Sequence, residues 1–123
     1  MASHSSLACQ QNDASNIEFS DLIVRCYDAL IRDFQDAKRA HSEGNEDLLM
    51  DRIRHAQDIV TELLIGLDYE RGGEIAANLG RIYNYMLREL VGIRDSHAQQ
   101  TLDGMISIAG ELREAWVQVA CAG

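Results

Sequence analysis

Histidine and carboxylate side chains are the groups in this chain that could bind a metal ion or carry acid–base chemistry. The histidines are His4, His41, His55 and His97. Di-metal sites in helical bundles use a glutamate three residues before the histidine, which puts both ligands on one helix face. The residues at that position are Met1, Lys38, Arg52 and Arg94, so the motif is absent. Asp51 lies four residues before His55, but a lone pair of this kind is more often a solvated surface pair, and we expect no metal and no cofactor.

His55 is the one histidine well inside an expected helix, which makes it the candidate for a histidine phosphotransfer site. Domains of that class have a lysine and a glycine a few residues after the histidine, and these favour an anionic phosphoryl group. Here His55 is followed by AQDIV, and Asp58 would repel a phosphate. The sequence also offers no glycine-rich phosphate loop and no paired nucleophile and base. It therefore predicts a protein that is not an enzyme, with phosphotransfer through His55 as an alternative.

Composition and charge limit the classes of partner. The chain has 123 residues with a net charge of −9, from 20 acidic and 11 basic side chains. That charge argues against nucleic acid as a partner. No apolar run approaches the roughly 20 residues that a membrane-spanning helix needs. The first fifteen residues, MASHSSLACQQNDAS, have neither a basic nor an apolar signal-peptide region, so we expect a cytoplasmic protein without membrane insertion.

Apolar residues recur at spacings of three and four in four stretches, which predicts four amphipathic helices. The stretches are residues 19–37, 49–67, 75–91 and 102–119. Similar lengths and short connections favour antiparallel neighbours. We therefore expect an all-α protein, an antiparallel up-down four-helix bundle formed by residues 16–120 as one domain. Residues 1–15 are expected to be a flexible N-terminal tail.

Two features of the middle of the chain need an explanation. The adjacent Gly72 and Gly73 would each cost about 1 kcal/mol inside a helix, so they predict a helix boundary or a close approach of two backbones. The second and third helices also carry apolar stripes that are wider than one bundle seam requires. A well-covered core would explain this width, and so would a partly exposed groove for a partner helix.

The same region resembles a known family. Residues 56–90 read AQDIVTELLIGLDYERGGEIAANLGRIYNYMLREL, and weaker matches are YDALIRDF at residues 27–34 and ELREAW at residues 111–116. In these motifs the chain closely resembles the flagellar export chaperones of the FliS type, in register over about residues 18 to 119. It departs from the usual pattern at Glu18 and Phe19, where the family starts its first helix with Ser-Pro. It departs again at Arg25, which replaces an apolar residue, and in a tail without tyrosine.

The resemblance implies an antiparallel bundle that binds the disordered C-terminal segment of flagellin in the bacterial cytosol. Such a chaperone prevents premature polymerisation and aids delivery to the flagellar type III export apparatus, without a cofactor or catalysis. The resemblance also allows other flagellar export or regulatory proteins as partners. A helical adaptor for another client is a further alternative.

From the resemblance we expect the partner surface on the second and third helices. The expected contact residues are Leu64, Asp68, Ile75, Asn78, Leu79, Ile82, Tyr83 and Met86. Asn78 could hydrogen-bond a partner backbone. Leu79, Tyr83 and Met86 also suit core positions, and Asp68 suits the start of a helix, where its charge favours the helix dipole.

Overall fold

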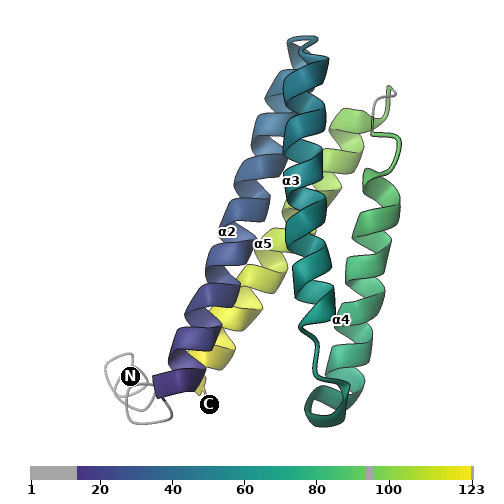
Figure 1. Cartoon of the computed structure of the whole chain (residues 1–123). Coiled ribbons are helices and arrows are strands. Elements are labelled where there is room, and N and C mark those ends of the chain that lie inside the picture. The colour runs from purple at the N-terminus through teal and green to yellow at the C-terminus, as the bar shows by residue number, and fades with distance from the viewer. Residues whose placement is uncertain (1–13, 94–95, 123) are drawn as a thin grey trace.

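The computed structural model describes residues 14–93 and 96–122, and in these residues the chain forms helices and no strands (Figure 1). The helices are α2 (Ala14–Ser42), α3 (Glu46–Ile65), α4 (Tyr69–Leu90) and α5 (Ala98–Ala122). The prediction of an all-α bundle is confirmed. The expected tail, residues 1–15, lies outside the described residues except for Ala14 and Ser15, which belong to α2. None of the described helices is long and apolar enough to cross a membrane.

Helix α2 is the central helix of the bundle. It packs along α3 on one side and along α5 on the other, whereas α4 packs against α3. Small side chains permit this close approach, because Ala37 and Ala40 of α2 are fully buried, as are Ala56 of α3 and Ala109 of α5. For the described residues, α4 and α5 do not form a comparably packed pair. The bundle is therefore open along the seam between α4 and α5.

The core draws large side chains from each of the four helices. The largest that are fully buried are Tyr27, Leu30 and Phe34 of α2, Leu49, Ile53 and Val60 of α3, Tyr83, Met86 and Leu90 of α4, and Leu102 and Met105 of α5. One hydrogen bond joins two of these side chains across the core, since the hydroxyl oxygens of Tyr27 and Tyr83 lie 2.5 Å apart. The pair satisfies two polar groups that would otherwise be buried without a partner. It also fastens α4 to α2.

Polar pairs tie α2 to its two neighbours. Asp28 accepts a hydrogen bond from Nε of Arg113 on α5 at 2.5 Å, and Lys38 pairs with Asp103 of α5. Toward α3, Oδ2 of Asp33 lies 2.5 Å from Nδ1 of His55. Asp33 is buried, whereas the His55 side chain is half exposed. Burial raises the pKa of Asp33, and the hydrogen bond and charge of His55 oppose that rise only in part.

The double glycine forms a kink at the start of α4. Asp68 caps the helix, because its Oδ1 accepts a hydrogen bond from the backbone nitrogen of Arg71 at 3.1 Å. Gly73 then has φ +52° and ψ −123°, which is not a helical conformation. A Cβ on Gly72 would lie 2.7 Å from Cβ of Ala76, a clash. The boundary expected at these glycines is confirmed by the kink, although α4 already starts at Tyr69, before it.

The kink folds the first turn of α4 back onto the rest of the helix. The Tyr69 hydroxyl would lie 3.0 Å from a Cβ built on Gly80, and a Leu67 methyl would lie 3.6 Å from it. Gly80 is therefore a place where the connection from α3 approaches α4 closely. The glycine pair and Gly80 together hold the start of α4 against the end of α3.

The conformation at the kink favours glycine at position 73, and a substitution can test this. Gly73→Ala places a Cβ in a left-handed conformation that only glycine adopts readily, so we expect the free energy of unfolding to fall by about 1–3 kcal/mol. The matched control is Gly104→Ala in α5, where an added Cβ meets open space. That substitution should be neutral or stabilising by up to about 1 kcal/mol. Urea unfolding followed by circular dichroism measures both, and equal stability of the two variants would contradict the required conformation.

Asp33 should give the stability a distinctive pH dependence. Its pKa is higher in the folded state, so the stabilisation belongs to the protonated carboxyl. This contribution is complete below the unfolded pKa of about 3.9 and is lost as the pH rises through the folded pKa. Asp33→Asn removes the buried charge and leaves an acceptor for His55. We expect the variant to gain stability relative to the wild type as the pH rises from about 4 toward 7.

The experiment compares urea unfolding of the wild type, Asp33→Asn and a control variant across that pH range. Asp58→Asn is the control, because it removes the same charge at an exposed position of α3. A stability difference between Asp33→Asn and the wild type that does not change with pH would contradict the expectation.

Candidate functional site

The open seam between α4 and α5 contains an apolar groove. Two adjoining hollows make it up, and they share Ile82 of α4 and Leu112 of α5. One hollow is lined by Arg81, Ile82, Tyr85, Ile108, Glu111 and Leu112. The other is lined by Ile75, Asn78, Leu79, Ile82, Leu112, Ala115 and Trp116. We call this site the α4–α5 groove.

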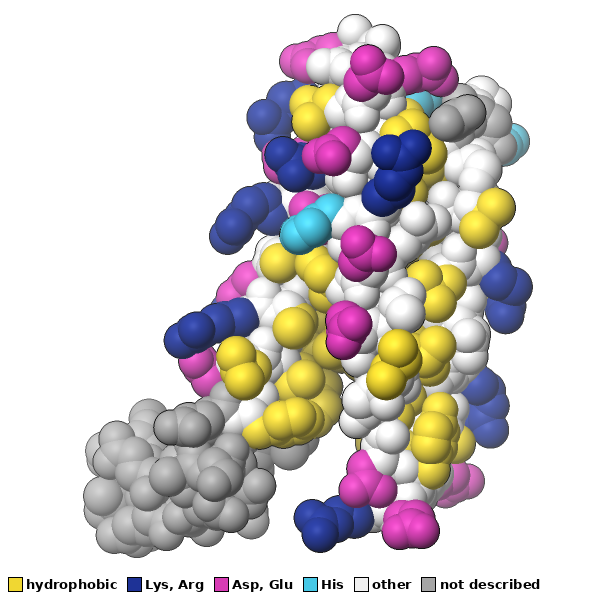
Figure 2. Space-filling model, in the orientation of Figure 1, with side chains coloured by type: hydrophobic (Ala, Val, Ile, Leu, Met, Phe, Trp, Pro, Cys, Tyr) yellow, Lys and Arg dark blue, Asp and Glu magenta, His cyan; other side chains and the backbone are white. Residues whose placement is uncertain are grey.

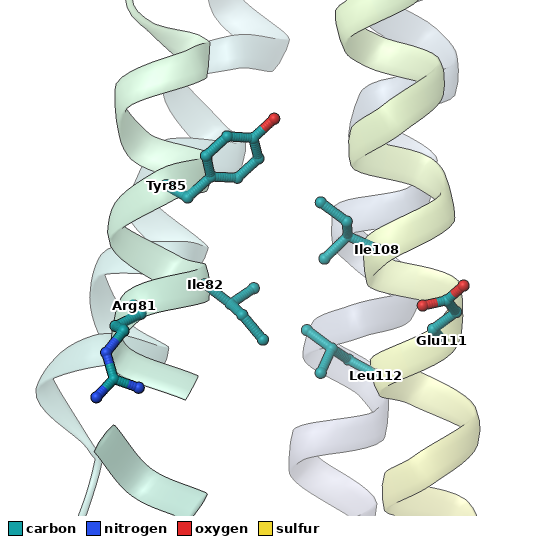
Figure 3. A pocket seen from close by; sticks show the side chains of 6 residues that line it. All are labelled: Arg81, Ile82, Tyr85, Ile108, Glu111 and Leu112. Carbon is teal, nitrogen blue, oxygen red and sulfur yellow. The ribbon is translucent and has the colours of Figure 1, made fainter. Parts of the chain in front are cut away.

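Figure 3 shows how the side chains of the first hollow face one another across the seam. Ile82 and Tyr85 extend from α4 toward α5, and Ile108 and Leu112 extend from α5 toward α4. Figure 2 shows hydrophobic side chains on both sides of the opening that divides the lower half of the molecule. Apolar side chains of α4 therefore face apolar side chains of α5 across the seam, and the two helices do not pack together over them.

The wall formed by α4 exists because this helix carries two apolar stripes. One stripe, with Ala76, Tyr83, Met86 and Leu90, is buried in the core. The other has Ile75, Leu79 and Ile82 at spacings of four and three, and it faces the groove. Ile75 is 71% exposed, while Leu79 and Ile82 are half-buried. From residue 75 to residue 85 this wall runs for about 15 Å, roughly three helical turns.

Trp116 connects the groove to the core beneath it. It lines the second hollow, and its ring packs edge-on against Phe19 of α2 at a centroid distance of 6.2 Å. Burial, chiefly, raises the pKa of the Tyr27 hydroxyl, Tyr83 adds to the rise, and the nearby Trp116 side chain acts in the opposite direction. Burial also raises the pKa of Tyr83. The hydroxyl pair that joins α2 to α4 thus lies close to Trp116 in the groove.

The expected contact residues fall into two groups. Ile75, Asn78, Leu79 and Ile82 line the groove together, and their role in binding stays a prediction. The other four do not line it: Leu64, Asp68, Tyr83 and Met86.

The structure places each of these four outside the groove. Tyr83 and Met86 are buried, because they lie on the α4 face that packs into the core. Leu64 packs against the core from α3, half-buried. Asp68 caps α4. In this structure Tyr83 and Met86 support the groove from behind, which corrects their expected position as surface contacts.

Sequence reasoning missed the wall that α5 provides. Ile108, Leu112, Ala115 and Trp116 form it, and Tyr85 adds an aromatic ring on the α4 side. Leu112 and Trp116 belong to the apolar stripe of the fourth helix, where periodicity alone assigns them to the core. The signal available was the match at residues 111–116, which includes both.

The polar groups of the groove are few. Arg81 donates a hydrogen bond to Oδ1 of Asn78. This leaves the Asn78 amide nitrogen as the donor that a partner could use. Elsewhere, His55 does not line the groove, and its Nδ1 is engaged with Asp33. Among the residues that the structure describes, no three His, Cys, Asp or Glu side chains gather as a metal site would require. The arrangement suits the binding of an apolar helix face.

Proteins similar to this chain come from several bacteria. The flagellar secretion chaperone FliS of Vibrio cholerae is 34% identical over 82 residues, which are 67% of this chain and 60% of that protein. The one from Salmonella typhimurium is 38% identical over 58 residues, 47% and 43% of the two chains. The one from Campylobacter jejuni is 28% identical over 112 residues, 91% and 88%. The matched region thus spans about half the length of the first two relatives and most of the third.

A family profile covers nearly the whole chain. The family described as flagellar protein FliS matches residues 2–122. The match includes the glycine kink, both walls of the α4–α5 groove and the hydroxyl pair beneath it. The chain therefore belongs to the FliS family, which is a family of flagellar secretion chaperones and not of enzymes.

Proposed function

We propose that the protein is a cytoplasmic export chaperone that binds the disordered C-terminal segment of flagellin in the α4–α5 groove. Binding would prevent premature polymerisation of flagellin and aid its delivery to the flagellar export apparatus. The observation that carries the proposal is the groove itself, an apolar seam about three turns long that the bundle leaves uncovered. The relatives named flagellar secretion chaperones support the choice of a flagellar client.

The groove has the properties of a helix-binding site. Amphipathic helices bind in apolar grooves through anchors at spacings of three and four residues, so three turns offer three or four anchor positions. Ile75, Leu79, Ile82, Ile108 and Leu112 stand on regular helices, and their positions are largely set before binding. A disordered segment loses conformational entropy when it folds on the surface, and burial of its apolar face offsets that loss.

The same physics explains how binding would block polymerisation. A flagellin segment that forms an amphipathic helix needs its apolar face to contact other subunits in a filament. The α4–α5 groove would cover that face while the subunit waits for export. Release would then expose it again without any covalent step, so the function requires no cofactor and no catalysis.

The alternatives have less support. Phosphotransfer would need a histidine in surroundings that favour an anion, whereas His55 contacts the carboxylate of Asp33. An adaptor for an unrelated client would use the same groove, and membership of the FliS family favours a flagellar client instead.

A titration tests the proposal directly. The probe is a synthetic peptide with the C-terminal segment of the flagellin from the same organism. Trp116 is the single tryptophan of the chain and lines the groove, so binding should shift its fluorescence to shorter wavelength. Calorimetry on the same samples gives the affinity. Absence of binding at micromolar concentrations would contradict the proposed client.

Substitutions locate the binding surface. Ile82→Asp or Leu79→Asp puts a charge on the apolar wall of α4, and we expect either to weaken peptide binding at least about tenfold. Val91→Asp is the matched control, because Val91 is 73% exposed but does not line the groove. Circular dichroism verifies that each variant is folded. A folded groove variant with the affinity of Val91→Asp would place the client elsewhere.

A further inference from the structure

Two side chains of opposite charge stand at the two margins of the α4–α5 groove. Arg81 belongs to the α4 margin and Glu111 to the α5 margin, and both are exposed (Figure 3). Among the described residues, the Arg81 side chain hydrogen-bonds only the neutral amide of Asn78. The Glu111 side chain forms no ion pair or hydrogen bond with any residue that the structure describes. Each margin therefore carries a charge without an opposite charge beside it.

The neighbouring charges on α5 are already paired. Arg113 donates to Asp28 of α2 at 2.5 Å and lies 3.5 Å from Glu114. Lys38 of α2 pairs with Asp103. Arg81 and Glu111 differ from these residues because the open seam separates them. Among the residues that line the two hollows, the charged ones are thus a cation on the α4 side and an anion on the α5 side.

We propose that Arg81 and Glu111 select the charge arrangement of the client helix and, with it, the direction in which the client lies. This inference rests on the proposed function. The bound segment would place acidic side chains over the α4 margin and basic side chains over the α5 margin, on the two flanks of its apolar stripe. Opposite charges at these distances attract and like charges repel, which suppresses the wrong arrangement.

The choice of direction follows from the geometry of a helix. When the apolar stripe faces the groove, reversing the helix end to end exchanges its left and right flanks. Margins of equal charge could not distinguish the two directions, whereas margins of opposite charge can. The apolar walls supply affinity in either direction, so the charges decide between two otherwise similar poses.

The test uses charge reversal with the synthetic flagellin peptide as the probe. The variants are Arg81→Glu, Glu111→Lys and the double variant. Because the two changes cancel, the double variant keeps the net charge of −9. Exposed ion pairs contribute little, so each single reversal should weaken binding about three- to tenfold at low salt. The loss should shrink at about 1 M salt, where the Debye length is about 3 Å.

Matched controls make the same charge changes outside the groove. Arg54→Glu and Glu62→Lys lie at exposed positions of α3, and neither residue lines the groove. They should leave the affinity within about twofold, since neither residue lines the groove and only the weaker effect of total charge remains. Equal effects of the control and groove variants would overturn the inference, because total charge would then explain the result.

The double variant separates arrangement from net charge. It should bind the natural peptide more tightly than either single variant does, because the peptide can lie in the reversed direction and again match both margins. The preference between the two ends of the peptide, measured by energy transfer, should then be opposite to that of the wild type. A double variant that binds no better than the single variants, or that keeps the wild-type direction, would overturn the inference.

Energy transfer from Trp116 reads the direction. Trp116 lies at the end of the groove formed by the start of α4 and the end of α5. A dansyl group on one end of the natural peptide should therefore accept more energy than the same group on the other end. Equal transfer to both ends would overturn a single direction. Absence of binding to the wild type would instead reject the proposed function, so the two failures are distinguishable.

Discussion

The packing of α2 between α3 and α5 is the constraint on which the rest of the structure depends. Buried alanines bring these helices together, and Asp28, Asp33 and Lys38 then reach partners on both neighbours. With α2 in the centre, α4 has α3 as its one extensively packed neighbour among the described helices. One apolar stripe of α4 is consequently buried, and none of the described helices covers the second.

Leaving the second apolar stripe of α4 uncovered lowers the stability of the folded chain. Exposed apolar surface forgoes roughly 25 cal/mol for every Å² that a closed bundle would bury. The chain tolerates this loss because the core below is continuous, from Tyr27 and Phe34 on α2 to Met105 on α5. The free energy forgone in folding becomes available for binding. A site made in this way requires only apolar side chains on two regular helices and a gap between them.

Periodicity in the sequence predicted the helices well, because an apolar stripe at spacings of three and four reflects a property of each helix alone. It also identified Gly72 and Gly73 as a boundary, since glycine in tandem has a known cost. It could not separate Ile82, which lines the groove, from Tyr83, which is buried. Both are apolar and adjacent, and the difference depends on which helix lies opposite.

The α5 wall was missed for the same reason. Leu112 and Trp116 follow the core periodicity of their helix, and only the three-dimensional arrangement reveals that the seam above them is open. Membership of the FliS family reduced the number of candidate functions. The charges at the margins of the α4–α5 groove could be interpreted only from the structure, which places Arg81 and Glu111 on opposite sides of it.

The kink at Gly73 sets how far α4 is rotated about its own axis, and so which of its side chains face the groove. Each residue advances a helix by about 100°, so one residue inserted or deleted in the short turn before Glu74 would rotate every later side chain by that angle. Such a rotation would carry the groove stripe off the seam and expose part of the buried stripe, although no side chain had changed. Connections at a protein surface usually tolerate changes of length. The connection before Glu74 fixes which side chains of α4 face the groove. Its length is therefore as constrained as the identity of any side chain in the groove.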